Sequence, residues 1–98
     1  MNVINRTALR SLMKSHPEVA GAMDAWWRAV KAARWKHIEE CRGSFSRADQ
    51  VGRCLIFDIL GNKYRLITVV SWRNQRIYIK EILTHREYER NLWKKWAY

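Results

Sequence analysis

GNKYRLITVV, residues 61–70, decides the fold that we expect for this chain. An apolar run rich in β-branched residues, Cys54–Leu60, precedes it, and a second such run, Arg76–Leu83, follows after Trp72–Gln75. Residues of this kind favour strands. Gly61-Asn62 predicts a two-residue hairpin turn, because both residues adopt positive φ readily. With a looser second turn at Trp72–Gln75, the three runs predict an antiparallel meander.

Charge is the strongest feature of the composition. Nineteen Lys and Arg against nine Asp and Glu leave a formal net charge of +10 on 98 residues. Such a field attracts polyanions, which include nucleic acid, an anionic membrane and an acidic protein partner. The alternative is a solvated surface that happens to be basic. Nucleic acid is the partner that we favour.

Length and residue usage limit the class of protein. Ninety-eight residues suit one small core, so we expect residues 1–98 to form a single domain. No apolar run approaches the ~20 residues that span a bilayer, and the first residues lack the apolar stretch of a secretory signal. Two cysteines, Cys41 and Cys54, make no disulfide framework. We therefore expect a reduced, cytoplasmic protein without a membrane partner.

Two helices are predicted before the meander. The first begins at a cap, Asn5 or Thr7, and ends near Ser15, because His16-Pro17 interrupts it. The second carries an apolar stripe at helical spacing that we expect to cover one face of the sheet, with its adjacent tryptophans in the core. The stripe consists of Val19, Met23, Trp26, Trp27 and Val30. Val3-Ile4 is a possible short fourth strand.

The expected fold class is therefore α+β. It has a small antiparallel sheet of three to four strands, two N-terminal helices on one face and a short C-terminal helix. Residues 33–51 show no clear period and are expected to form a long loop. His37 and Cys41 within it stand four residues apart, as metal ligands on a helix do, but two such residues alone are weak support. We expect no metal and no cofactor.

Alternation along the strands assigns side chains to faces. Lys63, Arg65, Ile67 and Val69 share one face, which we expect to be open if helices cover the other. Register decides whether Lys80 joins them, and Glu81 falls on the side opposite Lys80. After the strands, Thr84 with Glu87 three residues later predicts a capping box and a C-terminal helix.

The order of these segments resembles the HigB-type toxins of bacterial toxin–antitoxin pairs, within the RelE/ParE superfamily. The likeness runs along essentially the whole chain, from the tryptophan-bearing second helix to the end of the strands. The pieces that carry it most specifically are Gly61–Leu66, Tyr78–Lys80 and Thr84–Tyr88, with Arg47–Val51 before the first long strand.

The resemblance implies an endonuclease that cuts messenger RNA on the translating ribosome. It also implies a HigA-type antitoxin with a helix-turn-helix domain. The toxin would contact operator DNA only indirectly, through this antitoxin. The superfamily contains ParE-type poisons of DNA gyrase as well, so fold likeness does not settle the target. A third possibility is a non-catalytic basic module that binds RNA or DNA.

RNA cleavage without a metal uses the ribose 2′-OH as nucleophile and needs a base, an acid and cations at the phosphate. We expect Arg65 to clamp the phosphate, since guanidinium binds two phosphate oxygens in a planar fork. His85 is the expected acid or base, because imidazole changes charge closest to neutral pH. Lys63 would neutralise charge, and Tyr88 would contact the phosphate or stack on a base.

Each candidate has a plain structural alternative. Arg65 could be a solvated strand residue, and His85 with Tyr88 could be the capped start of a packed helix. Lys80 is expected to bind RNA, although lysine on an open sheet face is ordinary. Arg73 and Arg76 at the second turn are candidate contacts to ribosomal RNA or to the antitoxin, or solvated charge. Glu81 is a weaker candidate base.

Overall fold

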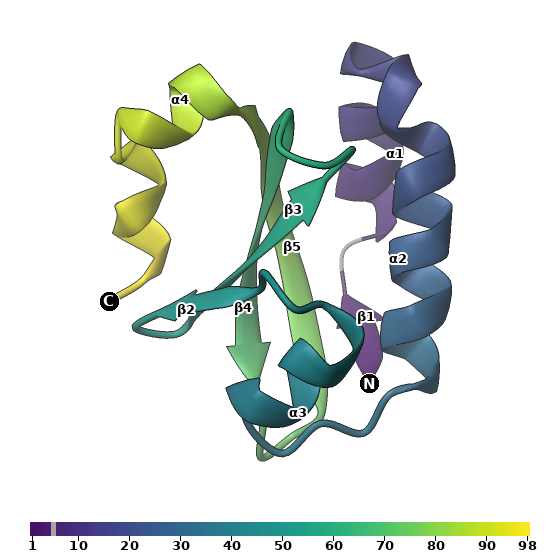
Figure 1. Cartoon of the computed structure of the whole chain (residues 1–98), viewed down its shortest axis with the longest axis vertical. Helices are drawn as coiled ribbons and strands as arrows, with labels where there is room; N and C mark the ends of the chain where they lie inside the picture. Colours follow the sequence, from purple (N-terminus) through teal and green to yellow (C-terminus); the bar gives the residue numbers. More distant parts are fainter. Residues whose placement is uncertain (5) are drawn as a thin grey trace.

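A computed structural model describes residues 1–4 and 6–98, and the side chains of residues 1–4 and 9–98. It combines one sheet with a helical layer on one face and a C-terminal segment on the other (Figure 1). The elements, in chain order, are β1 (Asn2–Ile4), α1 (Arg6–Ser15), the 3₁₀ turn η1 (Pro17–Val19), α2 (Ala20–Ala32), α3 (Ile38–Ser44), β2 (Asp49–Val51), β3 (Cys54–Ile59), β4 (Tyr64–Ser71), β5 (Arg76–Thr84), α4 (His85–Glu89) and the 3₁₀ helix η2 (Leu92–Trp96).

The sheet keeps the predicted meander at its centre, with the strand considered at Val3-Ile4 present as β1 at one edge and an unpredicted strand, β2, at the other. Within the described residues it has five strands in the order β1-β5-β4-β3-β2, and β1 runs parallel to β5. The α+β class is confirmed, but an all-antiparallel sheet of three to four strands is wrong. β1 becomes parallel because α1 and α2 return the chain across the sheet before β3. β2 was not predicted, because its three residues, DQV, are largely polar and show no pattern typical of a strand.

The turn between β3 and β4 is longer than predicted. Ile59 pairs with Tyr64, so four residues separate the strands instead of two. Positive φ occurs at Leu60 (52°) and Gly61 (65°), and not at Asn62. The two-residue turn is therefore wrong. The second turn, Trp72–Gln75, is confirmed, with the Gln75 N–H donating to the Trp72 carbonyl at 3.3 Å.

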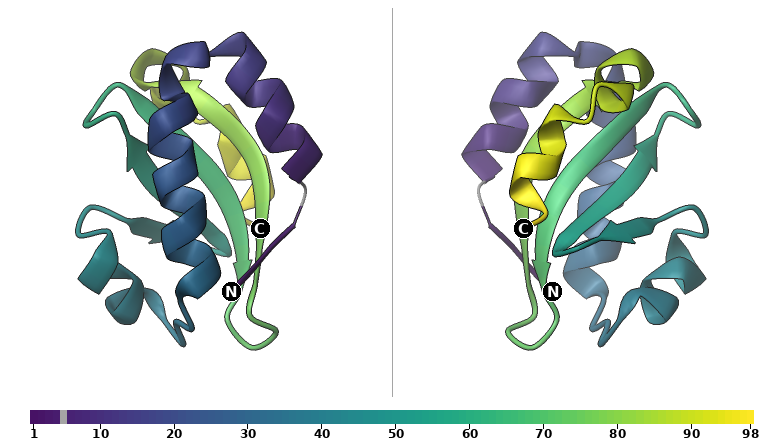
Figure 2. Two further views of the ribbon diagram at one scale, coloured as in Figure 1. Left: turned by 90° about the vertical axis from the view of Figure 1, so that its right-hand side faces the viewer. Right: turned by 90° about the vertical axis from the view of Figure 1, so that its left-hand side faces the viewer.

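The helical face of the sheet is closed by α1 and α2, as predicted (Figure 2). Four of the five stripe residues of the second helix are buried, and only Trp27 remains half-exposed. The Trp26 ring meets Phe57 of β3 edge to face, with centroids 5.4 Å apart. Pro17 forms the 3₁₀ turn that leads into α2. A cap at Asn5 lies outside the described residues, as does the side chain of Thr7.

The segment 33–51 is not a loop, contrary to expectation. It forms α3 and β2, and α3 was missed because seven residues give little periodicity. Cys41 of α3 is fully buried in the core, and burial raises its thiol pKa to about 12. His37 is exposed and lies 3.7 Å from Glu40. The two side chains therefore diverge, and within the described residues no three metal-ligating groups cluster.

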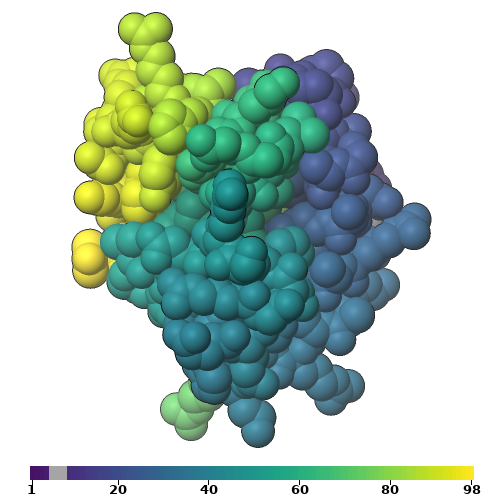
Figure 3. Space-filling model, in the orientation of Figure 1, coloured from purple at the N-terminus to yellow at the C-terminus, as the bar shows by residue number. Residues whose placement is uncertain are grey.

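The opposite face is not open, contrary to expectation, because the C-terminal segment covers much of it. Trp93 of η2 is 1% exposed and packs in a second cluster with Ile56 and Ile67. Figure 3 shows the yellow C-terminal segment on one flank and the purple and blue helices on the other, with the green and teal strand edge between them. In the described part of the chain, no helix is long and apolar enough to cross a bilayer.

Candidate functional site

Arg65 lies near the start of β4, on the face opposite α1 and α2, and is only 9% exposed. The alternation Arg65-Ile67-Val69 on this face is confirmed, since Ile67 and Val69 pack in the C-terminal cluster. Directly across from Arg65 on β3 is Asp58. The Arg65 Nε lies 3.2 Å from Asp58 Oδ1, so a cross-strand ion pair fixes the base of the guanidinium.

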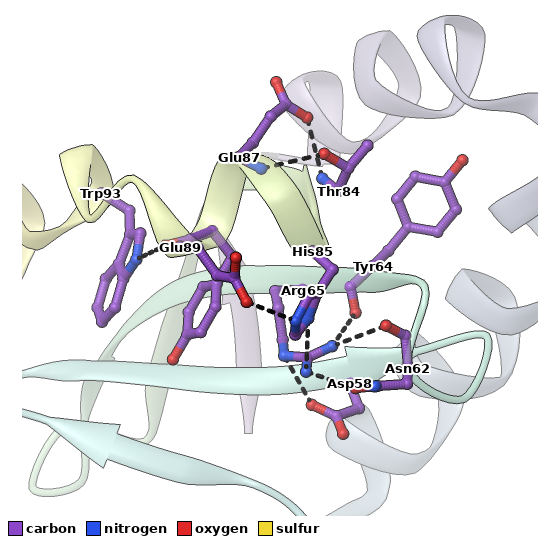
Figure 4. A network of polar contacts seen from close by, with 10 residues as sticks. Asp58, Asn62, Tyr64, Arg65, Thr84, His85, Glu87, Glu89 and Trp93 are labelled. Atoms are coloured by element: carbon purple, nitrogen blue, oxygen red, sulfur yellow. Dashed lines mark hydrogen bonds and ion pairs between the residues drawn. The ribbon is translucent and has the colours of Figure 1, made fainter.

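Five acceptors from the protein surround the guanidinium (Figure 4). Besides the Asp58 carboxylate, Nη1 donates to the Asn62 and Tyr64 carbonyls, at 3.3 and 3.2 Å, and Nη2 donates to Asn62 Oδ1 at 2.6 Å. The fifth is His85 Nδ1, 3.3 Å from Nη2. Guanidinium has five N–H donors. Arg65 is therefore the centre of a network within the protein, and not the free fork that the sequence led us to expect.

His85 is brought to Arg65 by the capping box, which is confirmed. Thr84 Oγ1 accepts from the Glu87 N–H at 3.2 Å, and Glu87 Oε1 accepts from the Thr84 N–H at 2.9 Å. That box starts α4 at His85. The His85 N–H also donates to the Lys63 carbonyl of the β3–β4 turn, at 3.2 Å. Together these bonds set the imidazole beside a residue twenty positions earlier in the chain.

The two imidazole nitrogens have different partners. Nδ1 faces a guanidinium donor, so it accepts, and in a neutral ring the proton then resides on Nε2. Nε2 lies 2.9 Å from Glu89 Oε1, one turn further along α4. Both side chains of this second pair are exposed, 48% for His85 and 65% for Glu89. The protonated edge of the ring therefore faces solvent, while the other edge is anchored.

Tyr88 lies on the same short helix. Its ring stacks on Trp93, with centroids 5.1 Å apart and planes 7° apart, and the Arg65 guanidinium lies 5.4 Å from its centroid. Burial raises the pKa of Tyr88; Asp49 and Asp58 raise it further and Arg65 opposes them. The phenol therefore keeps its proton through neutral pH and can donate a hydrogen bond.

A hollow of about 380 Å³ adjoins this network and shares Asp58 with it. The segment before β2 forms one wall, with Arg47 exposed on it, and the β3–β4 turn supplies Gly61. The remaining lining residues are Phe45, Ser46 and Ala48. The site thus has a basic side chain, a carboxylate and open volume beside the Asp58–Arg65 ion pair.

The sequence-predicted residues separate into two groups. The structure brings Arg65, His85 and Tyr88 together, with Lys63 adjacent through its carbonyl and its exposed side chain on the turn. Lys80 does not join them. Its Nζ lies 4.8 Å from the Trp96 ring, over the C-terminal segment.

Glu81 also contacts Trp96, accepting from its Nε1 at 3.3 Å. Placing Glu81 opposite Lys80 was therefore wrong. The cause is an irregularity in the β4–β5 register, where Ile67 pairs with Glu81 but Thr68 pairs with Ile79, leaving Lys80 unpaired. Such a bulge reverses the alternation that the prediction assumed. Among the described residues, no side-chain hydrogen bond or ion pair joins Glu81 to the Arg65 network, and its side-chain bond is with Trp96.

Arg73 and Arg76 lie at the far end of the β4–β5 hairpin from His85.

Three residues of the site were missed by the sequence analysis: Asp58, Asn62 and Glu89. Asp58 could have been found, because a single carboxylate in the otherwise apolar CLIFDI strand is unusual. Glu89 follows His85 by four residues on a predicted helix, which is a recognisable i,i+4 pair. Asn62 carried no signal beyond the turn.

The geometry can be compared with known proteins. A model of the HigB toxin family, described as the RelE-like toxic component of a toxin–antitoxin system, matches residues 19–91. The chain belongs to this family. The matched range includes Asp58, Arg65, His85 and Glu89, so the whole network lies inside the family region.

Curated relatives agree along nearly the full length. The mRNA interferase HigB of Escherichia coli O6:H1 is 26% identical over 93 residues, covering 92% of this chain and 90% of that protein. The mRNA interferase toxin HigB of Escherichia coli K12 is 25% identical over 92 residues, covering 91% of this chain and 88% of its own length. The mRNA interferase HigB of Shigella flexneri has the same identity and coverage. The chain is thus a HigB-family toxin component.

Proposed function

We propose that this HigB-family toxin is a messenger-RNA endonuclease that stops translation by cutting transcripts on the ribosome. The names of the relatives support RNA as the target, and the net charge of +10 suits a polyanionic substrate. The observation that carries the proposal is the contact between Arg65 and His85, because it puts an anchored imidazole with a solvent-facing Nε2 beside a buried cation.

His85 acts as the general acid in this proposal. The acting form is the imidazolium: a second proton on Nδ1 replaces the contact with the Arg65 guanidinium, and the Nε2 proton is directed outward. A scissile phosphate approaching Nε2 replaces the Glu89 carboxylate, exchanging one anion for another. That exchange is cheap, because exposed i,i+4 ion pairs contribute only about 0.3–0.5 kcal/mol. As the bond between phosphorus and the 5′ oxygen breaks, the imidazolium gives its Nε2 proton to that oxygen and becomes the neutral ring.

The base for the 2′-OH is Asp58 in this proposal. It borders the hollow beside Arg47, and its partnership with Arg65 keeps the carboxylate oriented. The 2′ oxygen attacks phosphorus, a 2′,3′-cyclic phosphate forms, and no metal is needed. Glu81, the base considered from sequence, is set aside because its carboxylate accepts from Trp96 of the C-terminal segment.

The other predicted residues take supporting roles. Arg65 is proposed to stabilise the charge of the phosphorane electrostatically and to orient His85 and Asp58, rather than to clamp phosphate with a free fork. Lys63, exposed on the turn, neutralises the incoming phosphate. Tyr88 donates its hydroxyl to a phosphate oxygen, consistent with its raised pKa. Lys80, Arg73 and Arg76 are proposed contacts to RNA away from the cut.

The partners follow from the family. We propose a HigA-type antitoxin with a helix-turn-helix domain that binds this toxin, and contact with operator DNA only through that antitoxin. The translating ribosome presents the message, so the site of action is the cytoplasm. The proposed reaction uses no cofactor.

The test is transcript cleavage in a reconstituted translation reaction with the purified chain. We expect new RNA ends within the translated message, suppressed by the antitoxin and absent with His85→Ala. Intact RNA together with damaged DNA would point to gyrase and overturn the proposal. Intact RNA and intact DNA, with nucleic-acid binding only, would indicate a non-catalytic module instead.

A further inference from the structure

A second hollow lies at the opposite end of the β4–β5 hairpin from His85. It measures about 640 Å³ and is lined by residues of the segment after α2 and of the Trp72–Gln75 turn. Figure 1 shows the course of these two backbone segments. Its lining consists of Arg34, Lys36, Trp72, Arg73 and Gln75. We call it the distal hollow. None of these five residues is acidic, in contrast to the hollow beside Asp58.

The cationic side chains of the distal hollow have no ion-pair partner among the described residues, although the Lys36 backbone N–H donates to the Glu40 carboxylate at 2.9 Å. Arg34, Lys36 and Arg73 are all exposed, and within the described residues none of them forms an ion pair with a carboxylate. Three like charges around one concavity repel each other, and a bound anion relieves that repulsion. The hollow therefore favours a ligand with more than one negative charge.

The hollow also contains an aromatic surface. Trp72 is half-buried, packing partly against the helical core while lining the hollow. Gln75 fixes the turn that carries it, because its Nε2 donates to the Trp35 carbonyl at 2.7 Å and the Trp72 carbonyl at 2.8 Å. The backbone of the turn is thus held in place, and the indole that it carries lines the hollow among the cations.

We infer that the distal hollow binds a second stretch of an RNA strand, with phosphates on Arg34, Lys36 and Arg73 and one unpaired base on Trp72. Phosphate and a stackable base alternate in single-stranded nucleic acid, and proteins that bind it combine cations with aromatic platforms in this way. An acidic peptide would satisfy the charges but leaves the indole without a matching group.

The distance between the two ends suits an RNA strand. From Arg65 to Ser71, β4 spans roughly 20 Å at about 3.3 Å per residue, so the distal hollow is well separated from His85. RNA bound there acts as an anchor and does not enter the cleavage reaction. This inference builds on the proposed function but concerns binding, and it can be tested without cleavage.

The experiment measures binding of a short fluorescent single-stranded RNA whose 2′ oxygens are methylated, so that it cannot be cut through a 2′-OH. The variants are Arg34→Ala/Arg73→Ala and, as a control with the same charge loss, Arg10→Ala/Lys14→Ala on the exposed surface of α1. We expect the distal variant to bind at least tenfold more weakly. The slope of log K against log salt should fall by about 1.4, or ~0.7 for each lost phosphate contact.

Trp72 supplies a second, independent comparison. Trp72→Phe keeps a ring for stacking and Trp72→Leu does not, while both lose the indole packing against the core. We expect Trp72→Leu to bind several-fold more weakly than Trp72→Phe, with both variants checked by thermal unfolding. Equal binding by the two, or equal binding by the distal and control double variants, would overturn the inference.

Other outcomes are also decisive. If the distal variant binds RNA normally but no longer captures the antitoxin, the hollow is a protein interface and the inference is wrong. Co-sedimentation with ribosomes, with and without a bound message, separates ribosomal RNA from messenger RNA as the source of the strand. A wild-type chain that binds uncleavable RNA through the hollow but never cuts RNA would refute the proposed function alone.

Discussion

The two ends of the β4–β5 hairpin hold their positive charge in opposite ways. At the His85 end, Arg65 is buried and surrounded by five acceptors, and carboxylates lie beside both Arg65 and His85. At the other end, the cationic side chains of the distal hollow are exposed and form no ion pair with a carboxylate among the described residues. A paired and buried charge fixes geometry, whereas an unpaired exposed charge is available to a ligand. The net charge of +10 therefore does not locate the chemistry by itself.

The largest expected effect is on the rate of RNA cleavage, which we assign to the His85 end. His85→Ala should lower the single-turnover rate of RNA cleavage by about 10²–10⁴-fold, the usual contribution of a general acid. Binding of uncleavable RNA should change little, since His85 is not part of the distal hollow. Arg34→Ala/Arg73→Ala should show the reverse pattern, losing more affinity than saturated rate. If both variants lose rate and affinity alike, the two ends do not have separate roles.

The second effect separates the two carboxylates of the His85 end. Asp58→Asn should reduce the cleavage rate by at least about 10²-fold, because it removes the proposed base. Glu89→Gln should keep or raise the rate, because phosphate no longer competes with a carboxylate for Nε2. The measurement is the single-turnover rate of both variants on the same message. If Glu89→Gln slowed cleavage more than Asp58→Asn, Glu89 and not Asp58 would be the base.

Stability gives a smaller contrast between the ends. Thr84→Ala should lower the free energy of unfolding by about 1 kcal/mol, the usual loss for a helix N-cap. Ser71→Ala at the other turn removes only an exposed 3.4 Å bond from the Asn74 N–H to Ser71 Oγ, so it should cost less. Urea unfolding of both variants checks the ranking. Equal losses would mean that the capping box does not stabilise the His85 end preferentially.

The smallest effect depends on pH. Hydrogen bonds from Thr84, first that of its backbone N–H, lower the pKa of Glu87 below its ordinary value of 4.5. The resulting stability is fully present above pH 4.5 and is lost as pH falls through the lowered folded value. Glu87→Gln should therefore be less stable than the wild type at neutral pH and approach it in acid. A difference that is constant across this range would contradict the assignment.

Local patterns carried most of the fold. Strand-forming runs, the Val19–Val30 stripe and the Thr84–Glu87 box identified the meander, the helical layer and α4 from short-range preferences. Failures occurred where a long-range contact decides the structure. β1 is parallel only because of how the helices return the chain, and Glu81 comes to the same side as Lys80 through a bulge that no alternation predicts. The C-terminal segment was not recognised as a cover because its tryptophans are also compatible with a partner surface.

Several residues of the site could be predicted from the sequence, but the way in which they contact each other could not. Arg65, His85 and Tyr88 could be chosen because their residue types match the chemistry and the resemblance. Whether Arg65 is free or engaged depends on Asn62 and Asp58, whose side chains reach it only after the four-residue turn has formed. The distal hollow brings Arg34 and Lys36 together with Arg73, which lies far from them in the sequence. Neither segment by itself predicts a shared hollow.

The most direct test is a double-mutant cycle on Arg65 and His85, measured as single-turnover cleavage of a message on translating ribosomes. The four proteins are the wild type, Arg65→Ala, His85→Ala and the double variant, each confirmed to be folded by thermal unfolding. Residues that act as a unit give strongly non-additive losses. We predict that the double variant cleaves about as slowly as the slower single variant. Losses that multiply, or normal cleavage by either single variant, would contradict the claim that these two residues form one RNA-cleaving site.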